Sequence, residues 1–69
     1  MKGAVITVGD EILIGQIVNT NAAWIGAQLT ALGLAVSDMI TVGDDAAAIT
    51  EALTHCLSRA QVLIVTGGL

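Results

Sequence analysis

Glycines and acidic residues follow three short apolar runs of this chain, and their types suit a ligand site. The three clusters are Gly9, Asp10 and Glu11; Gly43, Asp44 and Asp45; and Gly67 and Gly68. Adjacent carboxylates can act as general bases or bind a divalent cation. Glycines let backbone N–H groups approach a bound phosphate closely. The clusters are therefore candidates for one site, provided that the fold brings them together.

The apolar runs are typical of strands buried on both faces of a parallel sheet. Residues 3–8 and 62–66 are apolar without alternation, and residues 34–42 have an extended pattern. Residues 20–32 and a segment after Asp44 or Asp45 have helical spacing. Strand alternating with helix predicts an α/β fold, a parallel βαβαβ unit with right-handed crossovers.

The helix ends and buried faces can also be predicted. Asn19, Thr20 or Asn21 can cap the first helix, and Gly33 suits the position after its end. The predicted apolar stripes are Ile25, Leu29 and Leu32 in the first helix, and Ile49, Leu53, Cys56, Leu57 and Ala60 in the second. Trp24 is expected to anchor the first helix in the core or at its edge, with stacking on a ligand as the alternative.

Parallel strands deliver their following loops to the same edge of a sheet, where open α/β sheets bind ligands. Four of the six acidic residues would then lie at that edge, and no Lys or Arg lies in the three loops. Carboxylates repel phosphate, so a divalent cation such as Mg²⁺ on Asp10, Glu11 and Asp44 would reconcile them. A basic residue from elsewhere in the domain is the alternative.

Each candidate also has a purely structural interpretation. Asp44 and Asp45 can serve only as helix caps, and Gly67 and Gly68 only as turn residues. For Gly9, Asp10 and Glu11, a role in binding or catalysis is favoured over a purely structural one, because a turn rarely needs two adjacent acidic residues.

Composition excludes several classes. Cys56 is the only cysteine, so there is no internal disulfide. The net charge of -4 and only two basic residues disfavour a nucleic-acid partner. No apolar run approaches the roughly 18 residues of a membrane span, and a cytoplasmic location is expected. The G-x-G-x-x-G and P-loop patterns are absent from the sequence.

With 69 residues, the chain ends in a loop directly after the third predicted strand. We therefore expect residues 1–69 to be the N-terminal part of one longer domain. Two crossover helices leave a strand edge open to pairing. An assembly role is accordingly a further hypothesis, with a homo-oligomer expected for the full-length protein.

Three segments carry a family likeness. They are T-V-G-D-E-I-L-I-G-Q-I-V-N-T-N-A-A-W at residues 7–24, T-V-G-D-D at 41–45 and V-L-I-V-T-G-G-L at 62–69. Together they resemble the N-terminal domain of CinA, the competence/damage-inducible protein family, within the molybdopterin-binding superfamily. The resemblance implies a doubly wound, three-layer α/β domain that binds a nucleotide or pterin pyrophosphate at the strand ends. For CinA-like proteins it further implies metal-dependent cleavage of ADP-ribose.

The resemblance also implies roles for individual residues. Asp10 and Glu11 match catalytic and metal-binding positions, and Asp44 matches a metal-binding position. Ligand-binding positions are matched by Gly9, Asn21, Thr66, Gly67 and Gly68. Residue 19 is Asn where many relatives have Asp. The competing hypothesis is a module of molybdenum cofactor biosynthesis that binds molybdopterin or a nucleotide without hydrolysing it.

Overall fold

The computed structural model describes residues 1–15 and 18–67, which form three parallel strands connected by helices. The elements are β1 (Lys2–Val8), α1 (Asp10–Leu13), α2 (Thr20–Ala31), β2 (Ala35–Val42), α3 (Ala46–Leu57) and β3 (Val62–Gly67). The three strands and both long helices were predicted, whereas the short α1 was not. Helices α2 and α3 have 12 residues each, and no helix in the described ranges is long and apolar enough to cross a membrane.

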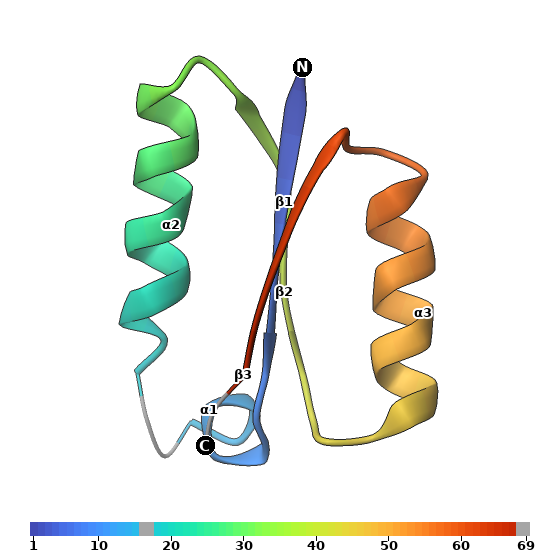
Figure 1. Cartoon of the computed structure of the whole chain (residues 1–69). Coiled ribbons are helices and arrows are strands. Elements are labelled where there is room, and N and C mark those ends of the chain that lie inside the picture. The colour runs from blue at the N-terminus through green and yellow to red at the C-terminus, as the bar shows by residue number, and fades with distance from the viewer. Residues whose placement is uncertain (16–17, 68–69) are drawn as a thin grey trace.

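The sheet has the order β2-β1-β3, with both strand pairs parallel. Helix α2 packs on one side of the sheet and α3 on the other, so the predicted α/β fold is confirmed (Figure 1). The strands end at the same edge, beside α1. This carboxyl edge therefore collects the loops that follow all three strands, as the sequence predicts.

Central strand β1 is buried on both faces because each face meets a different helix. On the α2 side, Val5 packs with Ala22 and Leu29. On the α3 side, the buried residues are Ala4, Ile6, Ala52, Cys56 and Ala60. Burial of apolar surface on both sides holds the strand whose carboxyl end carries the first acidic cluster. The expected packing role of Cys56 is confirmed.

Side-chain caps fix where the two long helices begin. Asn19 Oδ1 accepts a hydrogen bond from Ala22 N at 3.2 Å and caps α2. Asp45 Oδ2 accepts from Ala48 N at 3.0 Å and caps α3. Gly33 follows α2 with a φ of 88°, a conformation that glycine adopts without steric cost. Asp45, not Asp44, is therefore the cap of α3.

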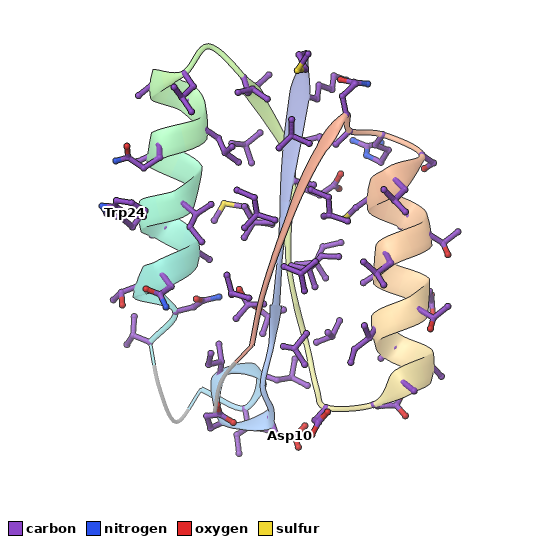
Figure 2. All side chains as sticks on the ribbon, viewed as in Figure 1. Asp10 and Trp24 are labelled. Carbon is purple, nitrogen blue, oxygen red and sulfur yellow. The ribbon has the colours of Figure 1, made fainter. Side chains whose placement is uncertain are left out.

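Three predicted core residues are instead exposed. Trp24, which was expected to anchor the first helix, is 65% exposed and points away from the sheet (Figure 2). Helix α2 buries Ala22, Gly26 and Leu29, which lie on the other face. Leu32 and Leu57, at the ends of the predicted stripes, are also exposed. Those predictions were wrong because small residues, not the largest ones, bring both helices close to the sheet.

A bulge at Ser37 sets which residues of β2 face each helix. Gly3 pairs with Val36 but Ala4 pairs with Asp38, so Ser37 is an extra residue in β2. Because side chains alternate along a strand, one extra residue exchanges the two faces for every later residue. The bulge places Asp38 on the α3 face and puts Thr41 in register with Thr7.

Asp38 joins β2 to the end of α3 through two basic groups. Arg59 Nε donates to Asp38 Oδ2 at 2.9 Å, and His55 Nε2 lies 3.2 Å from Asp38 Oδ1. Partial burial raises the pKa of the Asp38 carboxyl, but hydrogen bonding to Arg59, Ser37 and His55 together outweighs it and holds the pKa below its ordinary value of 3.8.

We expect Asp38 to stabilise the fold at neutral pH and to lose this contribution in acid. A lowered folded-state pKa gives stability that is present above the unfolded-state pKa and lost as the pH falls through the folded-state value. The free energy of unfolding should be higher for the wild type than for Asp38→Asn at about pH 7, and the difference should shrink below about pH 4. Urea unfolding at both pH values measures this. A difference that does not change with pH would contradict it.

Candidate functional site

The first and second loops of the carboxyl edge are joined by two hydrogen bonds. Gly9 N donates to Val42 O at 2.9 Å, which extends the β1–β2 pairing by one residue. Asp10 Oδ1 accepts a hydrogen bond from Asp44 N at 3.0 Å. Figure 2 labels Asp10 at this edge, close to the turn that leads into α3. The structure therefore brings the predicted residues Gly9, Asp10 and Asp44 together.

Glycines make room for the two acidic side chains of the first cluster. A Cβ on Gly9 would lie 2.9 Å from Glu11 Oε1, so this carboxylate folds back over Gly9. A Cβ on Gly43 would lie 2.6 Å from Asp10 Oδ1. The close approach of the Asp10 carboxylate to the second loop therefore requires glycine at position 43.

Asp10 and Glu11 form the first turn of α1, in a segment that was predicted as a loop. Acidic residues are favourable in the first turn of a helix, because the unpaired N–H groups carry a partial positive charge. A signal for this helix was present in the sequence, since the two acids precede the helix-compatible residues Ile12 and Leu13. It was missed because four residues are too few for a periodic pattern.

A row of threonines crosses the sheet just before the carboxyl edge. Thr7 is in register with Thr41 of β2 and with Thr66 of β3. Asn19 Nδ2 donates to Thr7 Oγ1 at 3.0 Å and reaches Thr41 Oγ1 at 3.5 Å. Asn19 was predicted as a helix cap first and a ligand contact second, and its contact with the threonines was not foreseen. The repeated Thr-Val-Gly-Asp segments, which start at Thr7 and Thr41, were the available signal.

The remaining predicted ligand-binding residues lie around this row. Asn21 is exposed in the first turn of α2, two residues after Asn19. Thr66 is half-buried, and Gly67 is exposed with open space where a Cβ would be. Gly68 lies outside the described residues. The geometry of β3 therefore places Thr66 and Gly67 beside the end of β1.

The charge at the carboxyl edge is negative. Asp10, Asp44 and Asp45 are exposed there and Glu11 is half-buried. Lys2 begins β1 and Arg59 lies between α3 and β3, so both basic residues are at the opposite edge of the sheet. A phosphate at the carboxyl edge would therefore need a metal cation, or a basic side chain from outside residues 1–69, to offset the charge of these carboxylates.

The predicted metal ligands Asp10, Glu11 and Asp44 do not converge on one point. In the described part of the chain, no group of three or more His, Cys, Asp or Glu side chains is placed to hold a metal ion. One reason is that Asp10 turns an oxygen to the backbone N–H of Asp44, not to its carboxylate. These three residues alone therefore do not form a complete metal site.

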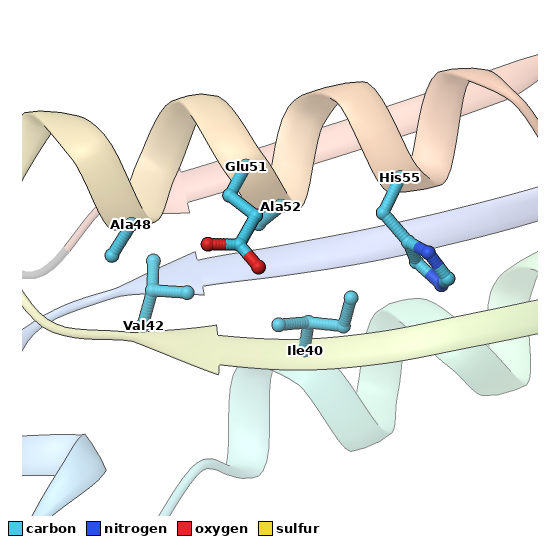
Figure 3. A pocket seen from close by; sticks show the side chains of 6 residues that line it. All are labelled: Ile40, Val42, Ala48, Glu51, Ala52 and His55. Atoms are coloured by element: carbon cyan, nitrogen blue, oxygen red, sulfur yellow. The ribbon is translucent and has the colours of Figure 1, made fainter.

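A cavity of about 340 Å³ lies between α3 and β2, and none of the predicted site residues that the structure describes lines it (Figure 3). Its lining residues are Ile40, Val42, Ala48, Glu51, Ala52 and His55. The lining is mostly apolar, and the Glu51 and His55 side chains project from α3 over β2. It lies on the α3 face of the sheet, whereas Asn19 and the threonine row lie on the α2 face.

Comparison with known proteins identifies the family of this fold. Residues 4–69 match the family described as "Probable molybdopterin binding domain". The chain belongs to this molybdopterin-binding domain family. Family membership confirms the resemblance that the three sequence segments carry, and it fits the parallel βαβαβ fold.

CinA-like proteins are among the relatives of this family member. A CinA-like protein of Salinibacter ruber is 48% identical over the whole chain, which spans 17% of that protein. A CinA-like protein of Frankia casuarinae is 49% identical over the whole chain, which spans 16% of it. The crystal structure of CinA from Thermoplasma acidophilum superposes with a TM-score of 0.94 at 44% identity, covering 99% of this chain and 40% of that one. The chain therefore spans about one sixth of each of the two CinA-like proteins and less than half of the crystallised CinA chain.

Proposed function

We propose that this chain forms the first part of a site for a nucleotide or pterin pyrophosphate, at the carboxyl edge of the sheet. In the complete gene product, this domain would hydrolyse a nucleotide pyrophosphate such as ADP-ribose. Residues 1–69 are on this proposal the N-terminal part of one molybdopterin-binding-like domain. The small share of each CinA-like relative that the chain spans supports this part of the proposal.

The observation that carries the proposal is the hydrogen bond from Asp44 N to Asp10 Oδ1 at 3.0 Å. It joins the loops after β1 and β2 at the edge where open α/β sheets bind ligands. Thr66 and Gly67 reach the same edge from β3. Residues from three strands thus meet in a member of a family described as molybdopterin-binding.

The residue types suit hydrolysis of a phosphoanhydride. One carboxylate can take a proton from a water molecule while the water oxygen attacks phosphorus and the P–O–P bond breaks. Glu11 is our choice for this base, because Asp10 Oδ1 is already an acceptor for the backbone of the second loop. The proton then passes to a product phosphate. ADP-ribose and water would give AMP and ribose 5-phosphate.

On this proposal a divalent cation would bind together with the ligand, held by its phosphates as well as by the protein. Mg²⁺ is commonly held by one or two carboxylates together with substrate phosphates, so Asp10, Glu11 or Asp44 could each contribute without forming a protein-only site. When bound, such an ion would neutralise the negative charge of the phosphates. Asn21, Gly9, Thr66 and Gly67 would contact the nucleotide or pterin.

The test is incubation of the complete gene product with ADP-ribose and magnesium chloride, followed by chromatography of the products. Formation of AMP and ribose 5-phosphate supports the hydrolase. Binding of ADP-ribose by calorimetry without product formation supports the alternative, a module that binds a nucleotide or molybdopterin without turnover. The family description names binding, which both hypotheses include. Absence of both turnover and binding would contradict the ADP-ribose proposal.

A second candidate function for this chain is a role in forming an oligomer. Trp24, Leu32 and Val65 are exposed apolar side chains on α2, just after it and on β3. On this proposal the complete protein is a homo-oligomer in which some of these side chains are covered. Light scattering of the complete protein gives its mass, and a monomer would contradict the assembly role.

A further inference from the structure

Asn19 is the side chain that connects the start of α2 to the two strands carrying the acidic loops. Its amide oxygen accepts from Ala22 N, and its amide nitrogen contacts the hydroxyls of Thr7 and Thr41. One planar group thereby joins α2, β1 and β2. A change at Asn19 would consequently affect both the helix cap and the packing of the helix on the sheet.

The contact with Thr7 is made in a buried place. Thr7 is 3% exposed, and it is flanked in its row by Thr41 and Thr66. A buried hydroxyl is costly unless it has a hydrogen-bond partner, and Asn19 provides one. The contact therefore favours one position of Asn19 over the others that a surface cap could adopt.

The Ser37 bulge is what makes the second half of this contact possible. Without the extra residue in β2, Thr41 would face α3 and its neighbour would face Asn19. The bulge puts Thr41 on the α2 face, within 3.5 Å of Asn19 Nδ2. The arrangement thus depends on the pairing of two strands as well as on the residue type at position 19.

We propose that Asn19 is a positioning residue, which sets where the first turn of α2, and with it Asn21, lies relative to the Asp10 and Asp44 loops. The inference rests on the proposed function, because Asn21 is one of its ligand contacts. Asn19 itself does not touch the reacting atoms. Its loss would displace a binding residue and leave the carboxylates on the β1 and β2 loops in place.

The experiment separates binding from turnover with the complete gene product and ADP-ribose. Asn19→Ser keeps a capping oxygen but is too short to reach the threonines. We expect its KM to rise about three- to tenfold, the equivalent of one or two hydrogen bonds, with kcat within about twofold of wild type. A merely structural role would lower the active fraction, and thus the apparent kcat, without changing KM.

Two further variants keep the test decisive if Asn19→Ser folds poorly. Thr7→Val with Thr41→Val removes the acceptors and leaves the cap, and it should raise KM to a similar extent. Asn19→Asp should restore nearly wild-type KM, since a carboxylate can cap α2 and accept from both hydroxyls. Wild-type turnover with an unchanged KM in Asn19→Ser and in the double threonine variant would overturn this inference alone. If the wild type binds ADP-ribose without hydrolysing it, the Kd of these variants should rise as predicted for KM, and an unchanged Kd would overturn the inference. A wild type that neither binds nor hydrolyses ADP-ribose would overturn the proposed function with it.

Discussion

Replacing Asp10 by Asn and Glu11 by Gln together should reduce the rate of ADP-ribose hydrolysis by about 100-fold or more. Loss of a general base typically costs about 100- to 10,000-fold in rate. The fold should survive, because the amide introduced at position 10 retains an oxygen that can accept from Asp44 N, as Asp10 does at 3.0 Å. Product formation by the double variant, measured at saturating ADP-ribose, gives the effect on kcat.

Asp45→Asn is the matched control for this experiment. Asp45 lies at the same acidic edge, but its side chain accepts from Ala48 N and caps α3. Asn is as good a helix cap as Asp, so this variant removes one charge from the edge without removing the cap. We expect its kcat to stay close to that of the wild type. Equal rates of product formation by the wild type and the Asp10, Glu11 double variant would contradict the proposed catalytic role of these two carboxylates.

Gly43→Ala should have the second largest effect, a reduction of kcat by about 10- to 100-fold, since a displacement near 1 Å can cost that much. The added Cβ would lie 2.6 Å from Asp10 Oδ1 and 3.4 Å from Leu13 Cδ2. Because the carboxylate is the mobile end of its side chain, it would rotate away and lose the hydrogen bond from Asp44 N. Steady-state kinetics on ADP-ribose measure the loss.

A double-mutant cycle identifies the cause of that effect. In an Asp10→Ala background there is no carboxylate for the new methyl group to displace, so Gly43→Ala should cause little further loss. Two contacting residues that act through one interaction give such non-additive effects. If the reductions in kcat caused by the two substitutions instead multiply in the double variant, Gly43 acts independently of Asp10. Our account of this contact would then be wrong.

The sequence predicted the fold well because burial of apolar runs, helix capping and glycine turns each depend on residues that are close together in the chain. The apolar runs became strands, Asn19 and Asp45 became caps, and Gly33 took the positive φ. The outward position of Trp24 could not be predicted in this way, since a helix with apolar residues on several faces does not reveal which one meets the sheet. Close packing of Ala22 and Gly26 on β1 and β2 decides it.

The site was predicted in outline because parallel topology alone gathers the loops. Its finer structure depends on contacts between distant residues. The Ser37 bulge exists only in the pairing of β2 with β1, and it determines that Thr41 meets Asn19. Likewise, the turn of Asp10 toward Asp44 N, which keeps three carboxylates from converging, follows from the space that Gly43 leaves. No local pattern in the chain carries this information.

Our central claim is that the carboxyl edge, and not the cavity between α3 and β2, binds the ligand. Hydrogen exchange of the complete gene product with and without ADP-ribose and magnesium tests it directly. We predict slower exchange at residues 9–11, 43–45 and 66–67, with residues 48–55 of α3 unchanged. Protection confined to residues 48–55, beside Glu51 and His55 of the cavity, would contradict the claim.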